Sequence, residues 1–411
     1  MRYVILGASG AGLNAIRELR RLDQNGKIIL ISKETRVYSR CILHHYLSGA
    51  RTAEQLSFVE DDFEERYRVE WHKGKSCISV ISDEKKIILD SKEEIFYDKL
   101  LIATGTSVEF PLIDNLEEAR NVSCFKSLED AEKIKQAAKK GKRFLVLGAG
   151  AEGMNCITGL LELGVIPVVV EKERWMLIRR LDEKAAGRYQ EAFAKRGVEQ
   201  HYGVGIASVL LDEEKNITKV ILTNGKQIDC DFLIITVERK PNVDFLKDSD
   251  VEVNTFGLVY DEYGETSEED VFGAGDVSGL HPIWPRAVKE GIAAANGMVG
   301  NKTEMLEFFE SKSTINYLGI PTFSLGNVNI MGHNYTIEIE ETKDGYKKII
   351  HQNGKIEGAL LQGELSYCTI LQQLISLRVD ISKIDKPVFE ITYSDFFHVE
   401  DNFNYYNDDF Y

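Results

Sequence analysis

The stretch that decides the fold runs from Arg2 to Glu34 and reads RYVILGASGAGLNAIRELRRLDQNGKIILISKE. An apolar run, Tyr3 to Leu6, leads into the small-residue turn Gly7 to Gly12, and a segment with one apolar helical face follows. A second apolar run, Lys27 to Ile31, ends shortly before Glu34. This order predicts a strand, a tight turn, a helix and a second strand parallel to the first.

The residue types of this turn suit a dinucleotide. Small side chains let the backbone approach a pyrophosphate, and the first turn of the helix offers free N–H groups to its charge. A carboxylate after the second strand, here Glu34, can hold ribose hydroxyls. Ser9 stands where the Gly-x-Gly-x-x-Gly pattern has its middle glycine. For this copy alone, an ordinary strand-turn-helix unit with small residues is therefore an alternative.

A second copy of the pattern favours dinucleotide binding. The apolar run Arg143 to Leu147 leads into Gly148-Ala149-Gly150-Ala151-Glu152-Gly153, which matches the pattern in full. A helical pattern follows up to Gly164, which is expected at the helix C-terminus, and Pro167 to Val170 then precedes Glu171. Two copies in one chain predict two dinucleotide-binding folds.

Length and charge narrow the class of protein. A chain of 411 residues is expected to hold two or three domains, and its formal net charge of -16 argues against nucleic acid as a partner. We find no apolar run long enough to cross a membrane and no signal-peptide region before the first strand. We therefore expect no membrane partner and a cytoplasmic location.

The cysteines indicate no metal site. Six of them are scattered along the chain, at positions 41, 77, 124, 156, 230 and 368, and no two form a Cys-x-x-Cys pair. This spacing supports neither an iron–sulfur cluster nor a zinc site, and a cytoplasmic chain of this size needs no disulfide framework. We expect most of the six to be small buried hydrophobic residues.

Further elements follow from local patterns. We expect a loop entering a short helix at Val37 to Gly49, a capping box at Ser127 to Asp130, and an Asn224-Gly225 hairpin turn with positive φ at both residues. Helices are predicted near Glu183 to Arg196, Arg286 to Val299 and Tyr367 to Leu377, strands at Ser76 to Ile81, Lys86 to Leu89 and Asp231 to Thr236, strands ending in glycine turns at Tyr97 to Gly105 and Glu269 to Val277, and further turns at Asp344-Gly345 and Asn353-Gly354.

In their order, these motifs resemble the FAD-dependent pyridine nucleotide-disulfide oxidoreductases, the family with two dinucleotide folds that includes glutathione reductase. The motifs are Gly7 to Gly12, Ala103-Thr104-Gly105, Gly148 to Gly153, Arg239 to Asn242 and Gly273 to Asp276. The resemblance implies an α/β fold with two Rossmann-like dinucleotide-binding domains, as in glutathione reductase, plus a C-terminal α+β domain. The expected boundaries are 1–110 and 231–304 for a discontinuous FAD-binding domain, 111–230 for the NAD(P)H-binding domain, and 305–411 for the C-terminal domain.

The resemblance also implies cofactor-binding residues. Those expected near FAD are Gly7, Ser9, Gly10, Ala11 and Gly12 at the pyrophosphate, Glu34 at the adenosine ribose, Asp276 after Gly275 at the ribityl chain, and Arg40, Cys41, Ala103, Thr104 and Gly105. Those expected near NAD(P)H are Gly148, Gly150, Glu152 and Gly153 at the pyrophosphate, Glu171 at the ribose, and Lys172. NADH is favoured over NADPH because a carboxylate repels a 2′-phosphate, although Lys172, Arg174 and Arg179 lie nearby.

One subgroup is more similar still. Tyr38-Ser39-Arg40, Tyr46 to Gly49 and Gly319 to Gly326 resemble the NADH:rubredoxin reductases and the flavin module of assimilatory nitrite reductases. That subgroup commonly has proline where this chain has Cys41. The segment Cys41 to Gly49 is also similar to the single-cysteine segment of CoA-disulfide reductases and of NADH oxidases or peroxidases. The chain has no Cys-x4-Cys pair, so dithiol relay chemistry is not expected.

Cys41 is a candidate catalytic residue together with His44. A thiol at a helix N-terminus, beside Arg40 and with His44 one turn on, favours the thiolate, which can cycle as a sulfenate or a mixed disulfide. The alternative is that Cys41 is a small residue in place of proline. The sequence leaves both interpretations open.

We therefore expect an electron-transfer oxidoreductase and flavoprotein that passes electrons from NADH through FAD to an acceptor. One hypothesis is a small electron-carrier protein of the ferredoxin or rubredoxin type. The second is a thiol or peroxide substrate, such as CoA disulfide, hydrogen peroxide or oxygen, with Cys41 essential. The third is a flavin subunit of a larger redox complex, with the acidic tail Glu400 to Tyr411 as an interaction segment; a homodimer is also compatible with the sequence.

Overall fold

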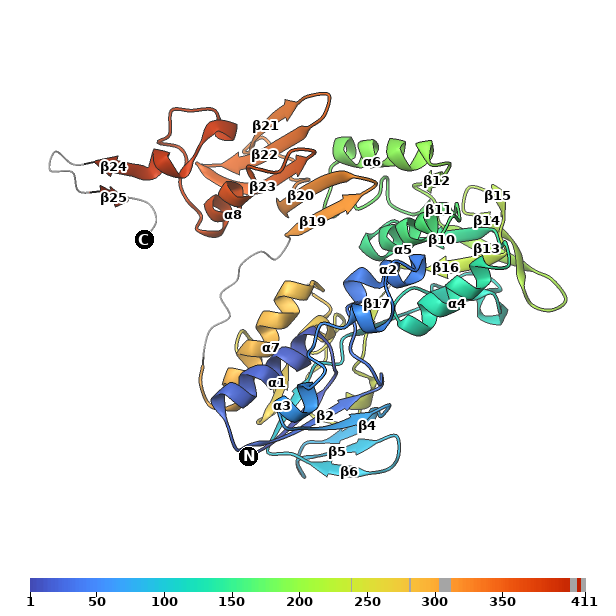
Figure 1. Cartoon of the computed structure of the whole chain (residues 1–411), viewed down its shortest axis with the longest axis vertical. Coiled ribbons are helices and arrows are strands. Elements are labelled where there is room, and N and C mark those ends of the chain that lie inside the picture. Colours follow the sequence, from blue (N-terminus) through green and yellow to red (C-terminus); the bar gives the residue numbers. More distant parts are fainter. Residues whose placement is uncertain (238, 281, 303–311, 400–404, 408–411) are drawn as a thin grey trace. The chain divides into compact units, whose positions relative to one another are not determined.

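The computed structural model describes residues 1–237, 239–280, 282–302, 312–399 and 405–407 (Figure 1). The chain divides into two compact units. The first comprises residues 1–112, 122–142 and 234–306, and the second residues 113–121, 143–233 and 307–411. The predicted fold class is confirmed: two Rossmann-like α/β sheets and a C-terminal α+β region are present.

The first unit is built on a five-stranded parallel sheet in the order β18-β7-β1-β2-β3. Its strands are β1 (Arg2–Leu6), β2 (Lys27–Ser32), β3 (Val69–Lys73), β7 (Lys99–Ile102) and β18 (Val271–Gly273). The order in which successive strands are added to the sheet reverses at β1, which lies between β2 and β7. In such sheets ligands bind outside the carboxyl ends of the strands at the reversal point, which here is where the turn after β1 lies.

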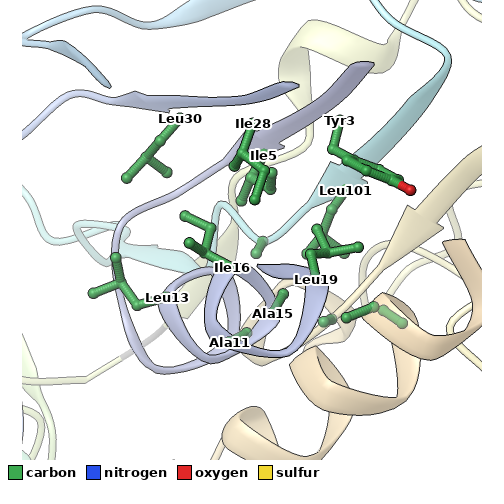
Figure 2. Close-up of a cluster of buried hydrophobic side chains, with 14 of the residues drawn as sticks. Tyr3, Ile5, Ala11, Leu13, Ala15, Ile16, Leu19, Ile28, Leu30 and Leu101 are labelled. Carbon is green, nitrogen blue, oxygen red and sulfur yellow. The ribbon is translucent and has the colours of Figure 1, made fainter. Parts of the chain in front are cut away.

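Helix α1 (Gly10–Leu22) covers this sheet through the apolar face that its sequence predicts. Ile16 and Leu19 of α1 are fully buried against Ile5 and Leu30 of the strands, as Figure 2 shows. Each such side chain contributes roughly 1.5–3 kcal/mol by leaving water. This core holds the turn between β1 and α1 in place.

Helix α7 (Trp284–Met298) packs closely on α1. It begins two residues before the predicted start, with a proline in its first turn, where proline is tolerated. A Cβ atom on Gly291 of α7 would lie 2.2 Å from the carbonyl oxygen of Ala11, so only glycine fits at this contact. The first turn of α1 is therefore enclosed by α7.

The rest of the first unit includes smaller elements. A three-stranded sheet is formed by β4 (Cys77–Ile81), β5 (Lys86–Leu89) and β6 (Glu94–Phe96), and a two-stranded ribbon by β8 (Thr106–Val108) and β17 (Arg239–Pro241). The remaining elements are α2 (Leu43–Ser48), α3 (Phe63–Arg66), β9 (Val122–Cys124) and α4 (Leu128–Ala138). The predicted capping box of α4 is confirmed, because Asp130 N–H donates to Ser127 Oγ at 3.1 Å and Ser127 N–H to Asp130 Oδ2 at 2.9 Å.

The second Rossmann-like sheet contains β12, β11, β10 and β16 in that order. Their bounds are β10 (Phe144–Leu147), β11 (Val168–Glu171), β12 (Glu199–Tyr202) and β16 (Phe232–Ile235), with helices α5 (Ala151–Glu162) and α6 (Glu183–Lys195). Helix α5 ends as predicted at Gly164, which has φ +85°; Gly164 N–H donates to Leu161 O and Val165 N–H to Leu160 O.

The hairpin at Asn224 differs from its prediction. Strands β13 (Ile206–Leu211), β14 (Ile217–Leu222) and β15 (Gln227–Asp229) form an antiparallel sheet, but only Gly225 has positive φ, at +84°. Leu222 N–H donates to Lys226 O and Gly225 N–H to Leu222 O, both at 2.9 Å. The loop is thus longer than a two-residue turn, and a loop of this length needs the left-handed conformation only at its glycine.

The C-terminal region holds an antiparallel sheet in the order β19-β20-β23-β22-β21. Its elements are β19 (Ser313–Tyr317), β20 (Ile320–Gly326), β21 (Thr336–Glu341), β22 (Tyr346–Gln352), β23 (Lys355–Gln362) and the predicted helix α8 (Cys368–Ser376), followed by β24 (Phe397–Val399) and β25 (Tyr405–Asn407). The predicted Asn353-Gly354 turn is confirmed, with φ +49° and +75°. Apart from β25, the predicted interaction tail lies outside the described residues.

Buried and partly buried polar contacts join the C-terminal sheet to α6 within the second unit. Asp182 caps α6 by accepting from Ala185 N–H at 3.0 Å. Its other carboxylate oxygen accepts from Tyr346 OH at 2.6 Å and from Lys348 Nζ at 3.0 Å. Tyr189 OH donates to Ile320 O at 2.6 Å. These contacts fix the C-terminal sheet on α6.

Among the residues described, no helix is both long and apolar enough to span a membrane.

Candidate functional site

The first glycine-rich turn is tightly closed. Gly7 has φ +115°, and its N–H donates to Ile31 O at 2.9 Å. A Cβ atom on Gly7 would lie 2.1 Å from Ala103 O, and one on Gly12 would lie 2.0 Å from Gly7 O. Side chains are therefore excluded at both positions, and the backbone itself forms the surface of the turn.

The start of α1 offers buried, uncapped N–H groups. Ser9 is the N-cap residue but makes no side-chain cap hydrogen bond, and the first helical bond runs from Leu13 N–H to Ser9 O at 3.0 Å. Gly10, Ala11 and Gly12 are buried ahead of that bond. Buried N–H groups need a partner, and an anion at a helix N-terminus supplies one. This arrangement fits a pyrophosphate.

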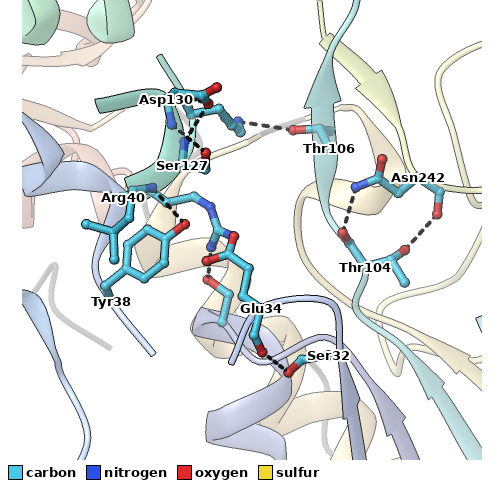
Figure 3. A network of polar contacts seen from close by, with 12 residues as sticks. Ser32, Glu34, Tyr38, Arg40, Thr104, Thr106, Ser127, Asp130 and Asn242 are labelled. Atoms are coloured by element: carbon cyan, nitrogen blue, oxygen red, sulfur yellow. Dashed lines mark hydrogen bonds and ion pairs between the residues drawn. The ribbon is translucent and has the colours of Figure 1, made fainter. Parts of the chain in front are cut away.

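Three predicted FAD residues meet beside this turn (Figure 3). Arg40 Nη2 lies 2.5 Å from Glu34 Oε1, and Arg40 Nη1 donates to Ser9 Oγ at 3.3 Å. The Arg40 guanidinium also lies 5.1 Å from the ring centroid of Tyr38. Arg40 and Glu34 are each about one-third exposed. The structure thus brings Ser9, Glu34 and Arg40 together, with polar atoms accessible for a ribose.

The Ala103-Thr104-Gly105 turn is held by Asn242 (Figure 3). Thr104 Oγ1 donates to Asn242 O at 2.8 Å, Asn242 Nδ2 donates to Thr104 O at 2.9 Å, and Asn242 N–H donates to Gly105 O at 2.9 Å. Asn242 ends the motif Arg239 to Asn242, whose role the sequence did not indicate. These bonds fix the turn after β7, beside the turn after β1.

The turn before Asp276 lies against the start of α1. Gly275 has φ +85°, and a Cβ atom on it would lie 3.1 Å from the Cβ atom of Ala11. A buried carboxylate that the sequence analysis missed, Glu290 of α7, accepts a hydrogen bond from Gly275 N–H at 2.7 Å. The sequence contains a weak indication that Glu290 is buried, because it falls on the same face of α7 as the buried alanines.

Cys41 and His44 differ from their expected setting. Cys41 is exposed and lies in a short 3-10 turn, Arg40–Ile42, which leads directly into α2. Burial, together with the charges of His45 and Arg51, lowers the pKa of His44 to about 4. His44 is therefore neutral at pH 7, and Arg40 is engaged with Glu34. Both predicted sources of positive charge for a thiolate are weaker than expected, because the pairing of Arg40 and the burial of His44 depend on tertiary packing.

The other cysteines also correct a prediction. Only Cys156 and Cys230 are buried, whereas Cys77, Cys124 and Cys368 are partly exposed. Within the described ranges, no group of three or more His, Cys, Asp or Glu side chains is placed to hold a metal ion.

The second glycine-rich turn repeats the first. Gly148 has φ +110°, and its N–H donates to Val170 O at 2.8 Å, as Gly7 donates to the end of β2. Gly150 is the N-cap residue of α5 and is exposed; a Cβ atom on it would meet nothing within 4 Å. Glu152 lies in the first turn of α5, and Gly153 is buried. Open space therefore stands in front of this helix start, where a second pyrophosphate fits.

Glu171 braces the second turn. It is 7% exposed, and its carboxylate accepts from Ala149 N–H at 2.6 Å and from Glu173 N–H at 3.0 Å. A carboxylate has about four acceptor positions, so these two hydrogen bonds occupy about half of them. Lys172, next to it, is exposed.

Comparison with known proteins identifies the family. The family profile of the pyridine nucleotide-disulphide oxidoreductases matches residues 1–291, and that of the rubredoxin NAD+ reductase C-terminal domain matches residues 313–378. The chain therefore belongs to the pyridine nucleotide-disulphide oxidoreductase family. Within it, this protein is an NAD(P)H-dependent flavin oxidoreductase whose cofactors are FAD and NADH.

Individual relatives agree with this assignment. The epsilon subunit of the NADH-dependent phenylglyoxylate dehydrogenase of Aromatoleum evansii is 26% identical over 396 residues, which cover 93% of each chain. The ferredoxin–NAD(+) reductase component of the 3-phenylpropionate/cinnamic acid dioxygenase of Photorhabdus laumondii is 30% identical over 315 residues, 72% of this chain and 77% of the relative. The chain spans about half (51%) of the assimilatory nitrate reductase electron transfer subunit of Bacillus subtilis.

A solved structure shows the same fold. The NAD-dependent persulfide reductase of A. fulgidus matches 92% of this chain and 77% of its own, with a TM-score of 0.85 at 22% identity.

Proposed function

We propose that this protein passes electrons from NADH through FAD to a small electron-carrier protein of the ferredoxin or rubredoxin type. The observation that carries the choice of acceptor is the setting of Cys41, in which Arg40 is engaged with Glu34 and His44 is neutral. The pairing of Arg40 and the neutral state of His44 both weaken the positive charge that favours a reactive thiolate. The match of residues 313–378 to the rubredoxin NAD+ reductase C-terminal domain supports the same acceptor class.

The first unit supplies the residues proposed to hold FAD. The uncapped N–H groups at Gly10 to Gly12 face the charge of the pyrophosphate, and Glu34 with Arg40 holds the adenosine ribose. Thr104 belongs to the turn that Asn242 fixes, and Asp276 holds the sugar-alcohol chain. FAD, when bound, accepts a hydride from NADH and releases electrons to an acceptor. The chain contributes rigid backbone turns and polar groups that position the cofactor.

The second unit supplies the residues proposed to hold NADH. The backbone at Gly148 to Gly153 approaches the pyrophosphate, with space in front of Gly150. Glu171 accepts from the ribose hydroxyls and places a negative charge where NADPH carries a phosphate. NADH is therefore the proposed electron donor.

Reduction of purified carriers tests the acceptor. Oxidised rubredoxin and a [2Fe–2S] ferredoxin are each supplied with NADH and the wild-type protein, the Cys41→Ser variant or the Cys41→Ala variant. Carrier reduction within threefold of wild type in both variants supports the proposal. Loss of carrier reduction in both variants, with reduction of an artificial dye retained, contradicts it.

A second candidate acceptor uses Cys41 itself. The exposure of this side chain favours a thiol or peroxide substrate, such as CoA disulfide, hydrogen peroxide or oxygen, because such substrates must reach the sulfur. Turnover of one of these that disappears in Cys41→Ser, while dye reduction persists, establishes this alternative.

The protein is also proposed to act within a larger redox complex. The support is the relative from Aromatoleum evansii, which is named as a subunit and matches over 93% of both chains. Purification from its native source tests this point. Co-elution with other subunits in fixed stoichiometry supports a complex, whereas a single active chain or a homodimer contradicts it.

A further inference from the structure

Glu290 is a buried carboxylate with three donors. Its side chain is 6% exposed in the second turn of α7. Oε2 accepts from Gly275 N–H at 2.7 Å and from Tyr260 OH at 2.9 Å, and Oε1 accepts from Arg286 Nε at 2.7 Å. A carboxylate can be buried only where such partners compensate for its lost hydration. The surroundings of Glu290 are therefore built for a charged group.

These contacts hold the backbone on both sides of Gly275. Tyr260 OH lies 3.0 Å from Gly275 O and shares its hydrogen with Glu290, while Glu290 takes Gly275 N–H. Gly275 stands at φ +85°, immediately before Asp276, and packs against Ala11 of α1. Loss of Glu290 frees the N–H of this turn and leaves Arg286 without its carboxylate.

Tyr260 serves as a permanent donor in this arrangement. Burial and the neighbouring carboxylate of Glu290 raise the pKa of Tyr260 well above its usual value. The hydroxyl therefore keeps its proton at every pH at which the protein is studied, and the geometry of the turn does not depend on pH through Tyr260.

We propose that Glu290 is a positioning residue for FAD, which fixes the Gly275 peptide so that Asp276 is held at the first turn of α1. This inference rests on the proposed function, in which Asp276 and that first turn hold FAD. The negative charge of Glu290 also acts on the cofactor through the electric field inside the protein. Reduction adds negative charge to the flavin, so removal of the Glu290 charge shifts the reduction potential of the bound flavin to a more positive value.

Four variants test the proposal. Glu290→Gln keeps the shape and one acceptor oxygen but turns an amide NH₂ toward Arg286, and Glu290→Ala removes all three contacts. Tyr260→Phe keeps the Glu290 bond to Gly275. Glu18→Gln is the matched control, because Glu18 of α1 accepts from Asn296 of α7 at 2.9 Å and so joins the same two helices away from the glycine turn.

The measurements are the dissociation constant of FAD from the apoprotein, the unfolding midpoint of the apoprotein, the KM for NADH at saturating FAD and the flavin reduction potential. We expect FAD binding to weaken about tenfold in Glu290→Gln and about 100-fold in Glu290→Ala, since hydrogen bonds to charged groups are strong. The potential becomes more positive in both, with KM for NADH within threefold. Tyr260→Phe and the control retain the wild-type potential.

The results that would overturn the proposed role of Glu290 are as follows. Wild-type FAD affinity and potential in Glu290→Gln overturn the proposal, and an equal loss of affinity in the Glu18→Gln control assigns the effect to helix packing and overturns it too. If Glu290→Ala does not fold, Glu290→Gln decides. Failure of the wild-type protein to bind FAD contradicts the proposed function itself, whereas a wild-type protein that NADH reduces, with an unaltered Glu290→Gln variant, contradicts only the role of Glu290.

Discussion

Replacing Gly150 with alanine separates NADH binding from folding. Gly150 has φ −73° and ψ −174°, which any residue adopts, and a Cβ atom there would meet nothing within 4 Å. The added methyl group therefore costs the folded chain nothing by contact or strain. The same space is where the NADH pyrophosphate is proposed to lie against the start of α5. Overpacking by one methyl group costs about 1–3 kcal/mol, which corresponds to a rise in the KM for NADH of roughly 5- to 150-fold.

The assay is steady-state dye reduction at varied NADH, together with thermal unfolding and FAD content. The matched control is Gly187→Ala in α6, where a Cβ atom also meets nothing within 4 Å. Because alanine is the better helix former, this control is expected to gain about 0.5–1 kcal/mol in unfolding free energy with an unchanged KM. An unchanged KM in Gly150→Ala would refute the proposed NADH site. A large drop in its unfolding midpoint would refute the geometry of the turn.

Three further variants test other parts of the account. Gly12→Ala places a methyl group 2.0 Å from Gly7 O, so FAD content and unfolding midpoint should both fall, by about 1–3 kcal/mol or more in stability; retention of both contradicts the tight turn. Asp182→Ala leaves Lys348, whose side chain is 12% exposed, without its carboxylate. Urea denaturation should show a loss of about 3–5 kcal/mol in unfolding free energy, part of which Lys348→Met restores in the double variant; an unrestored loss argues against the pair. The pKa of His44 is about 4 in the folded state and about 6.5 in the unfolded state. Between these two pH values the folded state binds fewer protons than the unfolded state, so the unfolding free energy should decrease as the pH falls from about 6.5 to about 4. We expect a decrease of about 1–2 kcal/mol after allowance for solvent screening, and denaturation curves at pH 4 and 7 should lose this dependence in His44→Asn; an unchanged dependence assigns it to other groups.

Much of the fold could be predicted because local patterns agree with tertiary packing. The structure adopts the predicted arrangement at the apolar faces of β1 and α1, at the capping box of Ser127 and at the glycine that ends α5. In each case the residue pattern is compatible with a single local conformation. The Asn224-Gly225 turn was the exception. Loop length, and not the dipeptide alone, decides which residues need positive φ, and loop length depends on where the flanking strands end.

The candidate site was predictable to the extent that backbone geometry defines it. The two glycine-rich turns share a positive φ at the first glycine and a bond from its N–H to the following strand, and both follow from the residue pattern. The pairing of Arg40 with Glu34, the burial of His44 and the role of Glu290 were not predictable in this way. Arg40 and Glu34 are only six residues apart, but the fold of the loop between them decides whether they meet. The burial of His44 and the contacts of Glu290 with Gly275 and Tyr260 depend on tertiary packing. A single charged residue among alanines gives only a weak signal.

The most direct test of the central claim is an anaerobic titration of the oxidised, FAD-loaded protein with NADH, counting the electrons accepted per FAD. The account predicts that two electrons reduce the protein fully and that no long-wavelength band from a thiolate beside the flavin develops. Uptake of two further electrons per FAD, with such a band appearing first, would show that Cys41 is a redox centre. That result would contradict the proposal that electrons pass to an external carrier without the participation of Cys41.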